Sequence, residues 1–174
     1  MKTKLLFTIL LAFIGLSANA QWLNTNCPCG GQSAQSIVSD GINIFAGNGN
    51  GVFLSSNNGG LWTIVSNGVT SYHLAISGSN IYAGNGNGVY VSSNNGGLWT
   101  KTSGLSGNGV GSIAASGTNV YAGTSPANNT NDDIFFSSDY GGTWTAIDNN
   151  IGLISAIAIS GSNILAANSQ GNII

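Results

Sequence analysis

No arginine and no glutamate occur in this sequence, and charged residues of any kind make up 5% of it. Five aspartates and three lysines carry all of the formal charge. Once the N-terminal Lys2 and Lys4 are set aside, Lys101 is the only lysine left against the five aspartates, a net charge of −4. A surface with one cation cannot neutralise a row of phosphates. Nucleic acids and anionic membranes are therefore poor candidates as partners.

Cysteine and histidine are nearly absent as well. Cys27 and Cys29 flank Pro28, and His73 is the single histidine. Two cysteines in an exported chain favour a disulfide, although a bridge between Cys27 and Cys29 would close a small, strained ring. We expect a local disulfide or two free thiols. A metal or redox role is the alternative. Two thiols and one histidine are fewer ligands than a typical metal site requires.

The only long hydrophobic run lies at the N-terminus. Lys2 and Lys4 precede the apolar stretch Leu5–Leu16, and Ala18 and Ala20 supply the small residues that a signal peptidase requires. Residues 1–20 are therefore predicted to be a signal peptide, so the mature protein, residues 21–174, is expected to be secreted, extracellular or at the cell surface. No later segment approaches the length of a membrane span.

Glycine and asparagine are abundant, and they are arranged in a repeat. The stretch SSNNGGLWT occurs at Ser55–Thr63 and again at Ser92–Thr100, and the related SSDYGGTWT occupies Ser137–Thr145. We call these three stretches the box hairpins. Each one ends a longer unit, and the units are expected over about residues 36–66, 73–103, 112–148 and 156–174, the last of them partial.

Each unit contains four short apolar segments separated by Gly- and Asn-rich turns. In the second unit the predicted strands are His73–Ser77, Asn80–Asn85, Gly88–Ser93 and Leu98–Ser103. The middle strands are apolar on both faces, so they must be covered on both sides, and the first strands have small side chains that suit a crowded inner position. The sequence therefore predicts an all-β fold, a β-propeller of four-stranded antiparallel blades with three complete repeats and a partial fourth.

The box hairpins are predicted to connect the third and fourth strands. A short acceptor side chain fixes the turn, a glycine supplies its unusual backbone angle, and a tryptophan covers it against the neighbouring blade. We expect the three tryptophans to be largely buried. The residues with these roles are Asn57, Gly59 and Trp62, then Asn94, Gly96 and Trp99, then Asp139, Gly141 and Trp144.

These stretches resemble the Asp-box, or BNR, repeat, whose pattern is Ser-any-Asp-any-Gly-any-Thr/Ser-Trp. Ser137–Trp144 matches at every fixed position, whereas the other two copies have asparagine in place of the aspartate and leucine in place of the threonine. The family includes sialidases, xyloglucan-cleaving glycosidases, sortilin-type receptors and photosystem assembly factors. The resemblance implies a propeller in which the box is structural and lies away from any catalytic centre.

Little enzymatic chemistry is available. A sialidase needs a cluster of arginines, so that activity is excluded, and no catalytic residue is predicted. Asp40 and Asp148 sit beside turns, and Asp139 belongs to a box, which leaves only the adjacent Asp132 and Asp133 as a carboxylate pair. His73 stands where the other units have Ser36, Ser112 and Ala156, and it is interpreted as a tolerated substitution.

The insertion Ser125–Asp133 is the candidate ligand loop, and its amide and carboxylate oxygens suit calcium. The residues concerned are Asn128, Asn129, Asn131, Asp132 and Asp133.

The number of blades is left open by the sequence. Gln21–Asn26 resembles a fourth strand and could close a ring of four blades, but the expected structure is an incomplete ring. Two functions follow. The first is a secreted, non-catalytic binding or scaffold propeller for glycan or protein, without a cofactor apart from a candidate calcium ion. The alternative is the front part of a larger glycoside hydrolase whose catalytic residues lie beyond Ile174.

Overall fold

The computed structural model describes residues 31–66, 68–105, 108–126, 134–148 and 152–174, and all of its regular structure is β. The first unit contains β1 (Ser36–Ser39), β2 (Ile44–Asn48), β3 (Gly51–Ser55) and β4 (Thr63–Ile64). The second contains β5 (His73–Ser77), β6 (Asn80–Asn85), β7 (Gly88–Ser92) and β8 (Thr100–Lys101). The third contains β9 (Asn108–Ser116), β10 (Asn119–Pro126), β11 (Ile134–Ser137) and β12 (Thr145–Asp148), and the fourth contains β13 (Ile154–Ser160) and β14 (Asn163–Asn168). The described residues include no helix that could cross a membrane.

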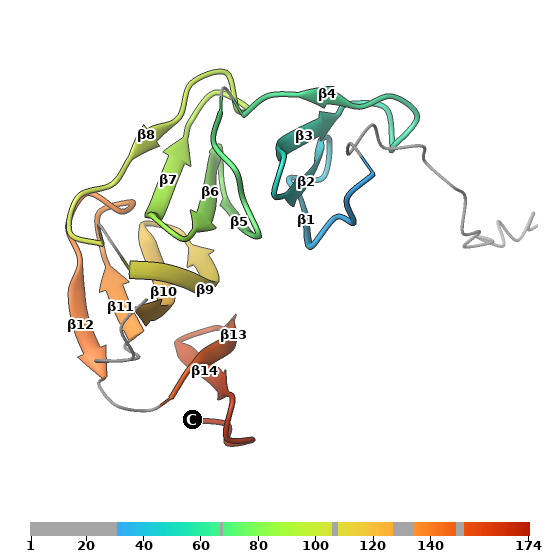
Figure 1. Cartoon of the computed structure of the whole chain (residues 1–174). Helices are drawn as coiled ribbons and strands as arrows, with labels where there is room; N and C mark the ends of the chain where they lie inside the picture. Colours follow the sequence, from blue (N-terminus) through green and yellow to red (C-terminus); the bar gives the residue numbers. More distant parts are fainter. Residues whose placement is uncertain (1–30, 67, 106–107, 127–133, 149–151) are drawn as a thin grey trace, which may run out of the picture.

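Each unit forms its own antiparallel sheet, in which strands that follow one another along the chain are neighbours. The sheets succeed one another in an open arc, with β5, β9 and β13 towards its inside and β8 and β12 on its outside (Figure 1). The first strands of successive units contact one another along the inside of this arc. Their small side chains permit this approach, as the sequence predicts. The all-β propeller architecture is confirmed, and its described sheets do not close into a ring.

The sheets cover one another because the units stack: the second and third sheets are covered on both faces, and the first on the face that it turns towards the second. We call the face that a unit turns towards the next one its forward face, and the opposite one its backward face. Phe45 and Val52 on the forward face of the first unit pack with Leu74, Ile81 and Ala83 on the backward face of the second. The same contact recurs one unit later, where Ala75, Tyr82 and Val89 meet Ile113, Val120 and Ala122. This repeated interface forms most of the hydrophobic core.

Tight turns join the second and third strands of the first two units. Asn48 and Asn85 are buried, and each side-chain oxygen accepts a hydrogen bond from the backbone N–H two residues later, at 2.8 Å in both units. Asn85 also donates to the carbonyl oxygen of Thr70 at 2.9 Å, which ties the turn to the preceding loop. The asparagine-rich turns therefore owe their shape to buried amides as well as to glycine.

Strand boundaries differ from the prediction in the second unit, where β7 ends at Ser92 rather than at Ser93. The fourth strand of the second unit is limited to β8, because the box hairpin extends through Leu98 and Trp99 before pairing resumes. The partial fourth unit has two strands and only the start of a third, in which Ala167 forms an isolated bridge with Ile173. Its turn is one residue longer than that of the second unit, so Ile173 takes the register of Val89.

Candidate functional site

The box hairpins are turns closed by their own side chains. In the first, the Ser55 hydroxyl accepts a hydrogen bond from the N–H of Gly59 at 2.9 Å and donates to Asn57 Oδ1 at 3.0 Å. Asn57 Oδ1 also accepts from the N–H of Leu61 at 2.7 Å. The second hairpin repeats these bonds with Ser92 and Asn94. Asparagine thus makes the turn that the resemblance implies for aspartate.

The third hairpin adds a bond that only its own sequence allows. Asp139 Oδ1 accepts from the Ser137 hydroxyl at 2.7 Å and from the N–H of Thr143 at 2.8 Å. Its other oxygen accepts from the Thr143 hydroxyl at 2.8 Å, a donor that leucine lacks in the other two copies. These bonds, chiefly the backbone one from Thr143, lower the pKa of Asp139 to about 2. The carboxylate is held as an acceptor within its own turn, and we assign it a structural role.

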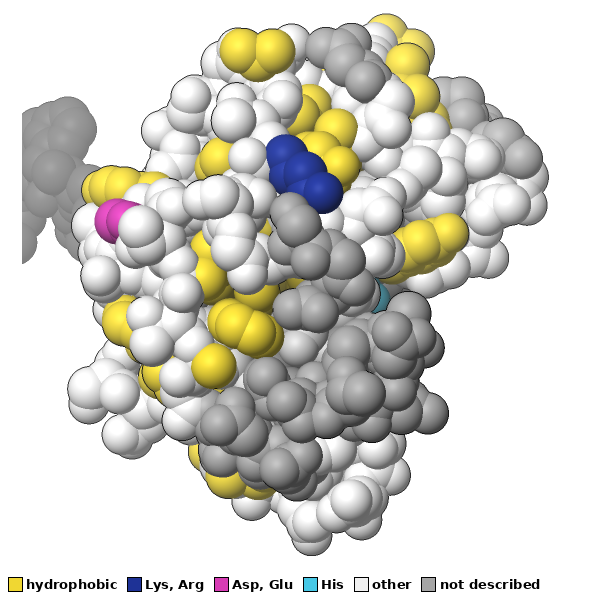
Figure 2. All heavy atoms as spheres, turned by 60° about the vertical axis from the view of Figure 1, so that its left-hand side comes forward, with side chains coloured by type: hydrophobic (Ala, Val, Ile, Leu, Met, Phe, Trp, Pro, Cys, Tyr) yellow, Lys and Arg dark blue, Asp and Glu magenta, His cyan; other side chains and the backbone are white. Residues whose placement is uncertain are grey.

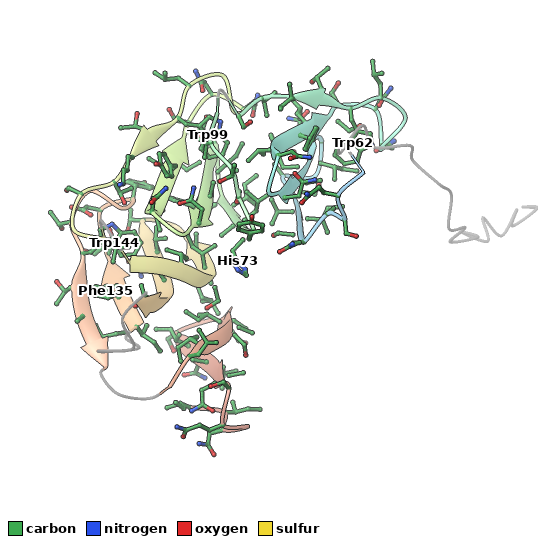
Figure 3. The ribbon with its side chains drawn as sticks, viewed as in Figure 1. Trp62, His73, Trp99, Phe135 and Trp144 are labelled. Atoms are coloured by element: carbon green, nitrogen blue, oxygen red, sulfur yellow. The ribbon has the colours of Figure 1, made fainter. Side chains whose placement is uncertain are left out.

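Each box tryptophan lies at an equivalent place on a successive sheet (Figure 3). Trp99 Nε1–H donates to the carbonyl oxygen of Val65 at 2.8 Å, and Trp144 Nε1–H donates to the hydroxyl of Thr102 at 3.2 Å. Both acceptors belong to the segment that leaves the preceding sheet. Trp62 is buried as predicted, whereas Trp99 and Trp144 are only partly buried.

Close approach of the units also explains a box glycine. Gly96 has φ +84°, and a Cβ atom there would come within 2.6 Å of Val65 Cγ2. The position therefore needs glycine for its backbone angle and for the room that the preceding unit leaves.

Tyr140 in the third hairpin has an unusual backbone conformation for its residue type. It has φ +60°, in the left-handed region, where the equivalent residues are Asn58 and Asn95, both with φ +56°. Asparagine tolerates this conformation, whereas a bulky side chain is strained in it. The N–H of Tyr140 donates to the carbonyl oxygen of Thr118 at 2.9 Å, and its side chain remains 48% exposed.

Tyr140 lines two hollows where the third unit meets the second. One, of about 270 Å³, is lined by Asn80, Val91, Ser93, Asn94, Leu98, Thr100 and Tyr140. The other, of about 380 Å³, is lined by Ser77, Gly78, Ser79, Asn80, Gly117 and Tyr140. We call the two together the Tyr140 cleft. Its walls are hydroxyls, amides, one aromatic ring and aliphatic groups, and none of its lining residues is charged.

A buried hydroxyl lies behind this cleft. Tyr82 is fully buried, and its ring passes 3.9 Å from where a Cβ of Gly141 would stand. Its hydroxyl is close to Asn80 but outside hydrogen-bond geometry, so it has no partner among the described residues. Burial raises the pKa of Tyr82, and the hydroxyl stays a neutral donor.

The remaining predicted residues do not gather at this cleft. Asp40 closes its own turn by accepting from the backbone N–H of Ile42 and Asn43, which lowers its pKa and fits the turn-forming role expected from the sequence. His73 lies on the inner strand β5, half-buried, and desolvation lowers its pKa (Figure 3). The described residues contain no cluster of His, Cys, Asp or Glu suited to a metal.

Several predicted site residues lie outside the described part of the chain. They are Cys27, Cys29, Asn128, Asn129, Asn131, Asp132 and Asp133, together with the N-terminal segment Gln21–Asn26. The interpretations of these residues as a disulfide, a calcium loop or a closing strand stay predictions.

Sequence reasoning did not single out Tyr140, although a signal for it exists. Aligning the three box hairpins puts Tyr140 in the column of Asn58 and Asn95. A turn position occupied twice by asparagine and once by tyrosine is a candidate for a role other than turn formation. The alignment does not predict the two hollows, because they form only where two units meet.

Comparison with known proteins supports the fold and no particular activity. No family model and no curated protein matches the chain. Among solved structures it is similar to the computationally designed protein Ika4, with a TM-score of 0.66 and 14% identity over 83% of this chain and 90% of that one. It is similar to the GH74 enzyme of Niastella koreensis, with a TM-score of 0.59 and 23% identity over 73% of this chain but only 23% of that one. A third similar structure is YCF48 bound to D1 peptide, with a TM-score of 0.58 and 16% identity over 79% of this chain and 50% of that one.

The natural proteins among these structural neighbours, including the GH74 enzymes and YCF48, are β-propellers, so the propeller fold stands. The chain spans less than a quarter of the GH74 enzymes it matches and half of YCF48.

Proposed function

We propose that this protein is a secreted, non-catalytic binding module of the Asp-box type, and that it holds a neutral glycan in the Tyr140 cleft. The observation that carries the proposal is Tyr140 itself, a half-exposed aromatic side chain kept at φ +60° that lines two uncharged hollows. A strained residue persists when the surrounding structure imposes it, and such residues gather at functional sites.

The chemistry of the cleft favours a sugar over other ligands. An exposed aromatic face covers the apolar side of a pyranose ring, and side chains such as Asn80, Ser93 and Thr100 can bond its hydroxyls. No cation lines the hollows to hold a phosphate, a sulfate or an acidic sugar. On the face shown in Figure 2, most of the described surface is white, that is, uncharged polar side chains and backbone, with scattered hydrophobic side chains and little charge. A neutral oligosaccharide therefore matches this cleft better than an anionic one.

The experiment is a screen of the chain from Gln21 onward against an array of neutral oligosaccharides, followed by calorimetry with the strongest ligand. Tyr140→Asn is the test variant because asparagine occupies the same position in the other units. Tyr72→Asn is the matched control, since Tyr72 is also exposed, at 38%, and lies outside the cleft. We expect Tyr140→Asn to weaken binding about tenfold, or about 1.4 kcal/mol, and Tyr72→Asn to leave it unchanged. Equal binding by both variants, or no glycan bound at millimolar concentration, would refute the proposal.

A second candidate is the front part of a glycoside hydrolase, favoured by the likeness to GH74 enzymes. Its remaining carboxylates would be Asp132 and Asp133, or residues beyond Ile174. Release of reducing sugar from xyloglucan or β-glucan by this chain, abolished by Asp132→Asn or Asp133→Asn, would establish the enzyme. We expect no such release.

A further inference from the structure

The forward face of each unit is closed by the unit that follows it, except for the fourth. A large apolar residue occupies the same place on the second strand of every unit. Its exposed fraction is 0% for Phe45, 0% for Tyr82 and 8% for Tyr121, each covered by a following sheet. The equivalent Leu165 is 46% exposed. This face has the composition of an interface between units, and no described sheet packs against it.

The rest of that face has the same character. Ile173 is 77% exposed, whereas Val89, which holds the same register in the second unit, is 0% exposed. Ala156, Ala158, Leu165, Ala166, Ala167 and Ile173 line a shallow groove of about 190 Å³. A groove walled by apolar side chains alone fits another apolar sheet face and offers little to a polar ligand.

The first unit exposes part of the complementary face: Ala46 and Phe53 on that face are buried with Trp62, but Ile37 is not. Ile37 on its backward face is 66% exposed, whereas the equivalent Leu74 and Ile113 are 6% and 8% exposed beneath the preceding unit. Trp62 Nε1 is buried without a hydrogen-bond partner in the described structure, whereas Trp99 and Trp144 each find an acceptor on the unit before them. At Ile37 and at the Trp62 indole N–H, the first unit therefore lacks the contacts that the second and third units have.

We propose that the fourth unit of one molecule binds the first unit of a second copy, head to tail, through a contact of the same kind as those within the chain. The occupant is argued from the internal interfaces, in which a forward face always meets a backward face. In a second copy, the backward face of the first unit, with its exposed Ile37, is available for this contact. None of the residues named on the two faces is charged, so their association needs no countercharge. Such a heterologous contact gives a closed ring when its rotation closes, and a chain of molecules when it does not.

The test is the molar mass in solution of the chain from Gln21 onward, measured by light scattering across a concentration series. We expect a mass above that of one chain at high concentration. Ile37→Asp and Leu165→Asp each place a charge on one half of the contact, and each should raise the dissociation constant of self-association at least tenfold. Leu61→Asp is the control, because Leu61 is equally exposed, at 67%, but lies in a box hairpin. Circular dichroism melts confirm that all three variants fold.

Mixing the two variants decides the geometry. Ile37→Asp retains an intact fourth unit and Leu165→Asp an intact first unit, so a mixture should form a one-to-one heterodimer and nothing larger. Dimerisation of Ile37→Asp alone would indicate a symmetric contact between two fourth units and overturn the proposal. A wild-type monomer at every concentration would overturn it too, as would association unaffected by Leu165→Asp.

Discussion

The indole N–H of Trp99 reaches across the boundary between two units and donates a hydrogen bond to the carbonyl oxygen of Val65 at 2.8 Å. Val65 leaves the sheet of the first unit, whereas Trp99 ends the box hairpin of the second. The bond therefore joins neighbouring blades, and Gly96 in the same hairpin lets Val65 come close enough for it. This relationship explains why the box recurs once per unit.

Replacing Trp99 by phenylalanine should destabilise the protein more than the same change at Trp62. Trp99→Phe removes the bond and leaves the Val65 carbonyl oxygen without that donor, at a cost of about 1–2 kcal/mol beyond the lost ring area. Trp62→Phe removes a buried N–H that has no partner among the described residues, so no bond is lost. Urea unfolding of the two variants measures the difference. Equal losses would show that the Trp99 bond adds nothing to ring burial.

Asp139 should tolerate asparagine but not alanine. Asn57 and Asn94 accept the same backbone hydrogen bond, so Asp139→Asn gives up chiefly the charge and the bond from the Thr143 hydroxyl. Asp139→Ala removes the acceptor of the Thr143 N–H and of the Ser137 and Thr143 hydroxyls, and should lower the melting temperature by clearly more. Because the folded pKa is about 2 against an ordinary 3.8, the carboxylate stabilises the fold above pH 3.8, and this contribution is lost as the pH falls towards 2.

The reciprocal change is a sharper check on the same turn. The double substitution Asn57→Asp and Leu61→Thr gives the first hairpin the carboxylate and the hydroxyl that form the extra hydrogen bond of the third hairpin. Leu61 is 67% exposed, so little burial is lost. The double variant should melt above the wild type, whereas Asn57→Asp alone should gain less. A melting temperature at or below the wild-type value would show that the Thr143 hydroxyl bond contributes nothing.

The fold could be predicted closely from the sequence, because the turn residues and apolar strand residues that determine it are close together in the chain and recur in every unit. The strands His73–Ser77 and Asn80–Asn85 are predicted to the residue, since a glycine-rich turn bounds each of them and apolar residues fill both faces. The proposed role of Tyr140 could not be predicted in this way, because it depends on hollows that two units form together. The exposure of Leu165 and Ile37 depends on whether another unit packs against their sheet face, and the sequence of one repeat does not specify this.

Tyr140→Asn should stabilise the fold while it removes the proposed ligand site. Tyrosine at φ +60° is strained by about 1 kcal/mol relative to a residue that accepts the left-handed region. Asparagine is such a residue at the same place in the first two hairpins. Urea unfolding should therefore show a gain of that size for Tyr140→Asn. A loss of stability would mean that the ring contributes more through contacts than its backbone costs, and the functional explanation of the strain would lose its basis.

His73 should make the protein less stable at mildly acidic pH. Burial is the cause that lowers its pKa below 6.5, so the folded state favours the neutral imidazole while the unfolded chain still takes up a proton near 6.5. Stability is therefore complete above about pH 6.5 and falls as the pH drops through that value and through the lowered folded pKa. The carboxylates Asp40 and Asp139 titrate below 3.8 in the folded state and do not contribute to this change.

Urea unfolding at about pH 8 and about pH 5 measures the effect, and His73→Ser is its control, because serine stands at the equivalent positions Ser36 and Ser112. The variant should lose the dependence on pH within this window. Since the chain has a single histidine, its imidazole resonance also reports the folded pKa directly by nuclear magnetic resonance. A titration midpoint at or above 6.5, or a variant that keeps the wild-type slope, would show that burial of His73 is not what couples stability to pH.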